Sequence, residues 1–403
     1  MSNLVFFERF DGNLSAWTLD TSGGTATIVT KDLSNKLKLN DTSGSNVVSA
    51  TYPFTAPTGT FIVEADVLQT GSISGLVELL DSSGTVIATV DTQSSGGTAS
   101  FSTDTVGAST CAWVNATYNE VVLVVDPVGD TIRFYWYDRS GGGGTYPQKF
   151  LAEKAYSGST IAKIRFSTKA GQTGTVYIDE VRVFSVDIGI IGDSVADGKV
   201  FWSNEPGVSY RVTSVTAGAP DENSSPSYQL GQLIGSHWAG NRGFGGATSN
   251  SVKNNIQSTI IDQGFTKCFI HVGINDIHSR VAIATLESNV STCATTLTSG
   301  GIAASDVYIA NVYGSPYFTT QAMIDDRIAF NIWVSELCVT NGYTLVDSDY
   351  YISDHPTYPN QQKTGYDAPD GIHLTPTGTG ALAQALYDAM FVNIPPKTQM
   401  SII

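Results

Sequence analysis

Residues 186–194 read VDIGIIGDS, a mostly apolar stretch that runs directly into Gly192-Asp193-Ser194. The apolar part has the length and composition of a buried strand, and the three residues that end it favour a turn. Ser194 is therefore expected where a strand meets the start of a helix, with its hydroxyl exposed at the sheet edge and backbone N–H groups beside it. This placement suits a nucleophile.

The pattern that follows Val186 alternates between strands and helices. Apolar segments predict strands at 186–191, 267–272, 307–312 and 343–346, and helices are expected near 227–238, 251–263, 284–299, 321–341 and 378–391. Such alternation is typical of a parallel sheet with helices on both faces. We therefore predict a three-layer α/β/α domain over residues 186–403. Its functional residues are expected at the carboxyl ends of the strands.

Three further motifs fall at such positions: NRGFGGAT at 241–248, GIND at 273–276 and DGIHL at 370–374. A serine hydroxyl is a weak nucleophile until a base removes its proton, and a carboxylate must hold that base in the right tautomer. His373 and Asp370 can fill these roles. The amide of Asn275 can donate to a developing oxyanion without carrying charge.

Each motif also has a purely structural interpretation, because Gly-Asp-Ser and Gly-x-Asn-Asp are ordinary turn sequences. Their conjunction at strand ends favours catalysis. The α/β-hydrolase Gly-x-Ser-x-Gly, the zinc-binding His-Glu-x-x-His and the phosphate-binding Gly-x-x-x-x-Gly-Lys-Ser/Thr are all missing from the sequence. Hydrolysis without a metal is therefore favoured.

Gly192-Asp193-Ser194 and the three further motifs resemble, in order and content, the four sequence blocks of the SGNH (GDSL-type) serine hydrolases. The resemblance covers roughly Val186 to Phe391. The resemblance implies that Ser194 is the nucleophile, His373 the base and Asp370 its orienting carboxylate, with no cofactor needed for catalysis. It also implies an oxyanion hole made of the Ser194 N–H, the Gly246 N–H and the Asn275 side chain. The choice of Gly246 comes from matching Asn-x-Gly-x-x-Gly-x-Thr to the second block, and Gly243 and Gly245 are the neighbouring alternatives.

Residues 1–185 read as strands and turns, which predicts an all-β sandwich. The expected strands are 4–6, 25–30, 36–40, 46–54, 60–68, 76–80, 86–90, 120–125, 131–137, 161–167 and 175–184. The start and end of this region resemble the jelly-roll carbohydrate-binding modules, in which the first and last strands pair. Such modules often hold a structural calcium, for which Glu8, Asp11 and Asp179 are candidate ligands.

The strand Phe134-Tyr135-Trp136-Tyr137 is the densest aromatic segment of the chain. With a period of two, Phe134 and Trp136 face one side and the two tyrosines face the other. One pair is expected in the core. The other pair is interpreted as cross-strand or domain packing, with a sugar-stacking surface as the alternative.

The composition narrows the partners and the compartment. A net charge of −16 argues against nucleic acid and anionic membranes, and no segment is long enough for a transmembrane helix. Only 14% of residues are charged, which favours a secreted, extracellular or virion-exposed protein. Residues 1–10 do not read as a signal peptide, because the apolar run is short and contains Glu8. Cys268, Cys293 and Cys338 are expected as buried thiols, with a Cys293–Cys338 disulfide as the alternative.

Segments around the expected site are polar and aromatic. We expect 201–225 to overhang Ser194 and 311–317 to form a wall. His278 is a candidate substrate contact, with an exposed surface histidine as the alternative, and Asp347 and Asp349 are expected to be solvated. These surfaces favour a hydroxylated, sugar-like substrate carrying a small acyl group. The sequence thus predicts an esterase that removes O-acetyl groups from an acetylated polysaccharide. The alternatives are a general short-chain ester or lipid esterase and a non-catalytic glycan-binding surface or virion protein.

Overall fold

The computed structural model describes residues 4–8, 10, 12–31, 34–70, 73–95, 98–112, 119–138, 148–197, 225–234, 240–354, 358–366, 368 and 370–392. The chain divides into two compact units, one within residues 3–185 and the other from residue 186 onward.

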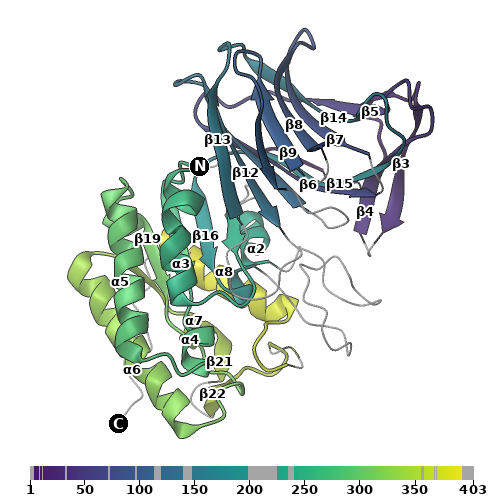
Figure 1. Cartoon of the computed structure of the whole chain (residues 1–403). Helices are drawn as coiled ribbons and strands as arrows, with labels where there is room; N and C mark the ends of the chain where they lie inside the picture. Colours follow the sequence, from purple (N-terminus) through teal and green to yellow (C-terminus); the bar gives the residue numbers. More distant parts are fainter. Residues whose placement is uncertain are drawn as a thin grey trace. The chain divides into compact units, whose positions relative to one another are not determined.

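The first unit contains two antiparallel sheets (Figure 1). One has the strand order β13-β12-β11-β6-β15-β4-β3, with β1 also paired to β15, and the other has the order β10-β9-β8-β7-β14-β5-β2. The strands of the first sheet are β1 (Leu4–Glu8), β3 (Gly24–Lys31), β4 (Ser34–Asp41), β6 (Phe61–Thr70), β11 (Asn119–Asp126), β12 (Thr131–Asp138), β13 (Gln148–Ala155) and β15 (Gly174–Ser185). Those of the second are β2 (Thr18–Asp20), β5 (Ser49–Pro53), β7 (Gly75–Asp81), β8 (Val86–Ser95), β9 (Thr98–Thr103), β10 (Ser109–Ala112) and β14 (Ile161–Thr168).

Alternate residues of the two sheets form one apolar core. Val63 and Val121 of the first sheet belong to the same buried cluster as Val77 and Phe166 of the second. This is the arrangement that period-two patterning produces when two sheets bury one face each. The N-terminal region is therefore a β-sandwich, and its narrower resemblance to a jelly roll stays a prediction.

The aromatic strand β12 packs rather than presenting exposed rings. Phe134 and Trp136 lie in the core cluster, and Tyr135 is only 1% exposed. These three rings match the packing interpretation and leave no accessible ring for stacking a sugar. The side chain of Tyr137 lies outside the described residues.

The first and last strands of this unit pair, with Leu4 opposite Phe184 and Glu8 opposite Val181. The Glu8 carboxylate accepts the Phe10 N–H at 2.7 Å, and Asp179 forms a buried ion pair with Lys36. Asp11 lies outside the described residues. Within the described part of the chain, no group of three or more His, Cys, Asp or Glu side chains has the geometry to hold a metal ion. The calcium hypothesis stays a prediction.

Four strands of the sandwich were not predicted: β2, β9, β10 and β13. In β9 only Ala99 and Phe101 are buried. Two apolar residues among Ser and Thr are too few for a period-two signal, so pairing with longer neighbours, and not local propensity, defines such strands.

The second unit is built on a parallel sheet with the order β17-β16-β18-β19-β20, which is 2-1-3-4-5 in chain order. Its strands are β16 (Ile188–Gly192), β17 (Gly240–Gly243), β18 (Lys267–His271), β19 (Val307–Ala310) and β20 (Thr344–Val346). The helical segments are α1 (Ser194–Asp197), α2 (Pro226–Ile234), α3 (Ser249–Ile256), the π-helix η2 (Gln257–Ile261), α4 (Ile274–His278), α5 (Ile283–Ser299), the 3₁₀ turn η3 (Ala304–Asp306), α6 (Gln321–Asn341), α7 (Ser348–Ile352) and α8 (Pro376–Phe391), and β21 (Ser353–Asp354) pairs with β22 (Tyr358–Gln362).

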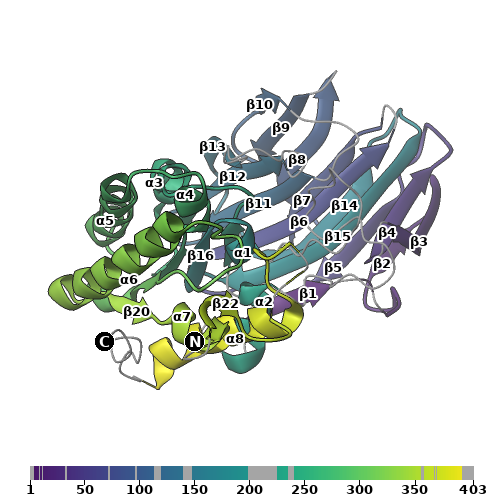
Figure 2. The ribbon, with the colours of Figure 1, turned by 90° about the horizontal axis from the view of Figure 1, so that it is seen from below.

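Helices cover both faces of this sheet, with α3, α5 and α6 on one face and α2 and α8 on the other (Figure 2). The order 2-1-3-4-5 changes direction between β16 and β18. In open α/β sheets the crevice at the carboxyl ends of such strands is where ligands bind. The fold therefore brings the segments after β16 and β18 together at this edge.

Helix ends follow local chemistry. Thr320 caps α6 by accepting the Met323 N–H, and the helix ends at Gly342 with a φ of +74°. Thr375 caps α8, and Pro376 occupies its first turn. The segment before α8 is therefore kept out of the helix, which leaves Asp370 to His373 in a loop.

Two expectations for this unit were wrong. Strand β17 was not predicted, because Gly240–Gly243 contains no apolar side chain, yet it forms a buried edge of the sheet. Asp347 and Asp349 were expected to be solvated but are 9% and 4% exposed. Asp349 is buried because it pairs with Arg327 at 2.8 Å, and Asp347 accepts the side-chain amide of Asn311 at the same distance.

Cys268, Cys293 and Cys338 are buried free thiols, so the Cys293–Cys338 disulfide alternative was wrong. Burial raises the pKa of the Cys293 and Cys338 thiols to about 12 each. Among the helices the structure describes, none combines the length and apolar character needed to cross a bilayer.

We predict that Gly192→Ala destabilises the protein. A Cβ at Gly192 would lie 1.9 Å from the His271 carbonyl oxygen and 2.8 Å from the Ala196 Cβ. Forcing an atom into a packed site costs roughly 1–3 kcal/mol or more. Thermal unfolding should show a clearly lower Tm for this variant.

Gly380→Ala is the matched control in the same unit. The nearest atom to a Cβ there is Gln229 Oε1 at 3.9 Å, and the residue lies inside α8. Alanine should stabilise a helix interior by about 0.5–1 kcal/mol relative to glycine. A Gly192→Ala protein as stable as the wild type would contradict the packing argument.

Candidate active site

Ser194 is the first residue of α1, and Asp193 alone separates it from the end of β16. The turn between them is fixed by Asp193, whose Oδ1 accepts the Val195 N–H at 2.9 Å, and by Gly192, whose carbonyl accepts the Phe244 N–H at 3.0 Å. Because the first N–H groups of a helix have no acceptor within it, the Ser194 N–H is placed to bind an anion.

Three side chains from distant positions are hydrogen-bonded in series. His373 Nε2 lies 2.7 Å from Ser194 Oγ, and His373 Nδ1 lies 2.5 Å from Asp370 Oδ2. Ser194 and His373 are 6% and 4% exposed, whereas 29% of the Asp370 side chain is exposed. The structure therefore joins the serine, imidazole and carboxylate that the sequence singled out.

The carboxylate of Asp370 uses its two oxygens differently. Oδ1 accepts the backbone N–H groups of Ile372 and His373, each at 3.0 Å, which leaves Oδ2 to face the imidazole. Burial raises the pKa of Asp370, but the hydrogen bonds and charge of His373 and these N–H groups outweigh it, so the net pKa is lowered. Asp370 is thus an ionised acceptor at neutral pH. It favours the tautomer in which Nδ1 carries the proton and Nε2 can accept one from Ser194.

Asn275 lies near the start of α4, after β18. Gly273 caps this helix with a φ of +126°, a conformation that side chains disfavour, and a Cβ there would lie 2.9 Å from Val312 Cγ2. The Asn275 amide donates to the Ala247 carbonyl at 2.9 Å. An amide has two N–H groups, so a second one is available to a substrate oxygen.

Gly246 directly precedes the residue that Asn275 contacts. Gly246 has a φ of +78° and is exposed, whereas the N–H of Gly243 already donates to Asn241 Oδ1 at 3.0 Å. Of the three candidate glycines, Gly243 is therefore the least suited to bind an oxyanion. The Asn275–Ala247 bond holds the Gly246 loop next to the Asn275 amide.

The sequence did not predict a buried polar network that lies behind the Gly246 loop and the start of α4. Asp276 accepts from the Ser249 N–H at 2.9 Å and from Ser249 Oγ at 2.6 Å, and Asn289 donates to Ser249 Oγ at 3.0 Å. Burial raises the pKa of Asp276 despite these bonds. The network ties the start of α3, after the Gly246 loop, to α4. The only sequence signal was the Asp of the Asn-Asp pair, which also suits a turn.

The segment expected as a substrate wall plays a different part. Tyr313 and Ser315 are both 0% exposed, and their hydroxyls contact the Asp370–His373 loop. Only the end of the segment stays accessible, where Tyr317 stacks on His278 with ring centroids 3.5 Å apart and planes 10° from parallel. Residues 201–224 of the expected overhang lie outside the described residues.

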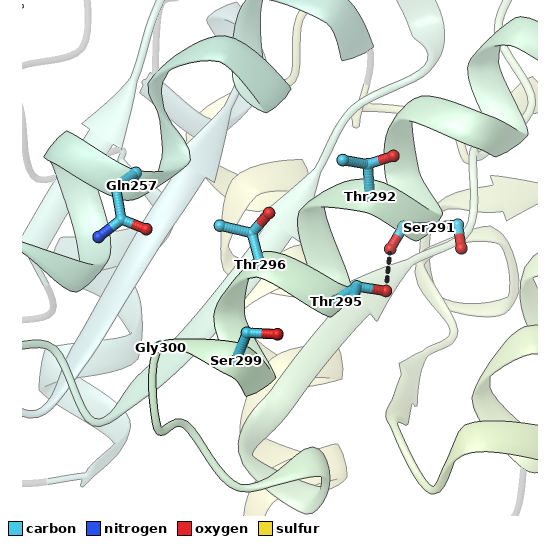
Figure 3. Close-up of a pocket in the computed structure, with 7 residues that line it drawn as sticks. All are labelled: Gln257, Ser291, Thr292, Thr295, Thr296, Ser299 and Gly300. Atoms are coloured by element: carbon cyan, nitrogen blue, oxygen red, sulfur yellow. Dashed lines mark hydrogen bonds between the residues drawn. The ribbon is translucent and has the colours of Figure 1, made fainter.

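A surface hollow of about 490 Å³ lies away from this site, between η2 and α5 (Figure 3). Its lining consists of Gln257, Gly300 and hydroxyl side chains of α5, among them Thr295, whose hydroxyl donates to the Ser291 carbonyl. None of Ser194, Asn275, Asp370 or His373 lines it. The hollow therefore takes no part in the chemistry of these four residues.

The second unit matches a known protein family. Residues 190–381 match the model of the GDSL-like lipase/acylhydrolase family. Comparison with curated protein sequences found no match.

Similar solved structures span about half of this chain. The lipase/acylhydrolase from Enterococcus faecalis is 15% identical, with 53% of this chain and 99% of that one covered and a TM-score of 0.40. A GDSL-like lipase from Bacteroides thetaiotaomicron is 13% identical, over 52% and 89% of the two chains, with a TM-score of 0.39. An acetyl xylan esterase from Geobacillus stearothermophilus is 15% identical, over 52% and 97%, with a TM-score of 0.37. The family match confirms the resemblance seen in the four sequence blocks: residues 190–381 form a domain of the GDSL-like lipase/acylhydrolase family.

Proposed function

We propose that this domain hydrolyses carboxylic esters through an acyl-Ser194 intermediate, and that it removes O-acetyl groups from an acetylated polysaccharide. The observation that carries the first part is the hydrogen-bond series from Ser194 Oγ through His373 to Asp370. A serine hydroxyl 2.7 Å from an imidazole nitrogen can be activated without a metal.

The reaction proceeds in two halves. Ser194 Oγ attacks the acyl carbon while its proton passes to His373 Nε2, and Asp370 stabilises the imidazolium that forms. The tetrahedral oxyanion accepts hydrogen bonds from the Ser194 N–H, the Gly246 N–H and the Asn275 amide. As the intermediate collapses, Nε2 returns the proton to the leaving alcohol. Water then attacks the acyl enzyme by the same steps, which frees the acid and restores Ser194.

The choice of a sugar ester is supported by the rings beside the reacting atoms. His278 follows Asn275 by three residues on α4, hence on the same side of the helix, and Tyr317 stacks on it. Tyr317 lies next to the catalytic loop, since a Cβ on Gly371 would be 3.8 Å from the Tyr317 backbone N. Burial, and to a lesser extent the charge of Asp370, raises the pKa of Tyr317. Partly exposed aromatic faces suit a pyranose ring better than a long acyl chain. The low charged fraction of 14% supports an extracellular site of action.

We predict that Ser194→Ala and His373→Ala each lower kcat for an activated acetyl ester by about 10⁶, as expected when members of one catalytic unit are removed. Release of p-nitrophenol from p-nitrophenyl acetate measures this. Activity near the wild-type rate in either variant would disprove the assignment. A wild type that turns over no activated ester would favour the non-catalytic alternative.

Asn275→Ala should lower kcat by about 10²–10³ with a smaller change in KM, because the lost donor acts mainly on the transition state. Ser249→Ala is the control, since it loosens the Asp276 contact between the same two loops but leaves the Asn275 amide in place. Its kcat should fall less than that of Asn275→Ala. Equal losses in the two variants would show that Asn275 acts by holding the loop and not as a donor.

The substrate class is tested by the size of the acyl group and of the alcohol. We expect kcat/KM to fall sharply for acyl chains beyond two carbons and acetate to be released from acetylated polysaccharides. His278→Ala should reduce kcat/KM on the polysaccharide more than on p-nitrophenyl acetate, because only the former presents sugar rings to the stacked pair. Rates that hold or rise with chain length would favour the general esterase or lipid esterase.

A further inference from the structure

Two hydroxyl groups from the segment after β19 contact the loop that carries Asp370 and His373. Tyr313 Oη donates to the Ile372 carbonyl at 2.9 Å, and Ser315 Oγ donates to the Gly371 carbonyl. Gly371 and Ile372 are the two residues between the carboxylate and the imidazole. Both hydroxyl-bearing side chains are 0% exposed, so these bonds are shielded from competing water.

The two peptide groups of this loop are each held at both ends. The Gly371 carbonyl and the Ile372 N–H belong to one planar group, and the Ile372 carbonyl and the His373 N–H belong to the next. In each, the N–H donates to Asp370 Oδ1 at 3.0 Å while the carbonyl accepts from a hydroxyl of Ser315 or Tyr313. The two ends of a trans peptide point in opposite directions, so rotating either plane would strain both bonds.

We propose that Tyr313 and Ser315 are positioning residues for the reaction. By fixing the two peptide planes they keep both N–H groups on Asp370 Oδ1, which turns Oδ2 toward His373 Nδ1. The inference rests on the proposed function, because it concerns how the same carboxylate is held.

The hydroxyls are well suited to act as permanent donors. Burial, together with the charges of Asp193 and Asp370, raises the pKa of Tyr313 well above its usual value, so the phenol stays protonated. Ser315 Oγ accepts the Tyr317 N–H at 3.1 Å, which leaves its own hydrogen for Gly371.

The segment that bears the two hydroxyls is itself anchored. Asn331 of α6 accepts the Val312 N–H at 2.8 Å and donates to the Val312 carbonyl at 2.9 Å. The Gly314 N–H donates to Ser353 Oγ at 2.6 Å. Tyr313 therefore lies between two residues whose backbone groups are held by neighbouring elements, so it can serve as a rigid support.

The side-chain amide of Gln362 can partly replace either hydroxyl as a donor to the loop carbonyls. Its Nε2 lies 3.5 Å from both the Gly371 and the Ile372 carbonyl oxygens, at the limit of a hydrogen bond. Loss of one hydroxyl can draw this amide closer. Removing both hydroxyls together is therefore the more decisive change.

The test compares kcat and KM on p-nitrophenyl acetate for the wild type, Tyr313→Phe, Ser315→Ala and the double variant. We expect kcat to fall by less than about tenfold in each single variant, where Gln362 can donate to the freed carbonyl, and by about a hundredfold in the double variant, with KM changed less than about twofold. Tyr308→Phe on β19 is the matched control. Tyr308 is 5% exposed, so the change removes the same atom from another largely buried tyrosine, and its kcat should stay at the wild-type value.

The same variants in an Asp370→Asn background separate positioning from general weakening of the structure. If the hydroxyls act through the Asp370 carboxylate, removing them there should lower kcat no further. The same fold loss in both backgrounds, or wild-type kcat in the double variant, would overturn the inference while leaving the proposed function intact. An inactive wild type would overturn the proposed function and this inference with it. Should Tyr313→Phe fail to fold by circular dichroism, Ser315→Ala in the two backgrounds decides.

Discussion

The hydrogen bond between Ser194 Oγ and His373 Nε2 joins side chains 179 positions apart in the sequence. It can form only if the end of β16 and the loop before α8 reach the same edge of the sheet. The parallel order 2-1-3-4-5 achieves this, because every strand of the sheet ends at that edge. Ser194 and Asn275 follow the two strands between which the order reverses. The fold thus brings the reacting groups close together, and local contacts fix their orientation.

Those local contacts depend on backbone groups more than on side-chain packing. Because Gly192 has no side chain, β16 can lie close to the His271 carbonyl. Gly273 adopts the positive φ that sets the direction of α4. Asp370 uses one oxygen to accept two backbone N–H groups, and the other reaches the imidazole. A carboxylate bound in this way has a single orientation. This is worth more to catalysis than to stability, since partly exposed ion pairs stabilise proteins little.

Much of this could be read from the sequence because its signals are local. Helix α6 matches the predicted bounds at both ends, since a Thr cap directly precedes its long helical segment and a glycine directly follows it. The residues of the hydrogen-bond series were found because each lies in a short motif. By contrast β17 has no apolar residue, and its place depends on pairing with β16, which no local pattern reports.

The burial of polar residues is even harder to predict from local sequence patterns. Asp349, Tyr313 and Ser315 look like surface or substrate-facing residues in the sequence, because isolated polar residues after a strand are usually exposed. Each is buried because its partner comes from elsewhere in the chain: Arg327 for the carboxylate, and the Gly371 and Ile372 carbonyls for the hydroxyls. Burying such groups without hydrogen-bond partners would cost several kcal/mol. Each of them therefore requires its partner at a defined position in the fold. The two hydroxyls lie beneath the Asp370–His373 loop, where a small shift of one peptide plane would turn the carboxylate away from the imidazole.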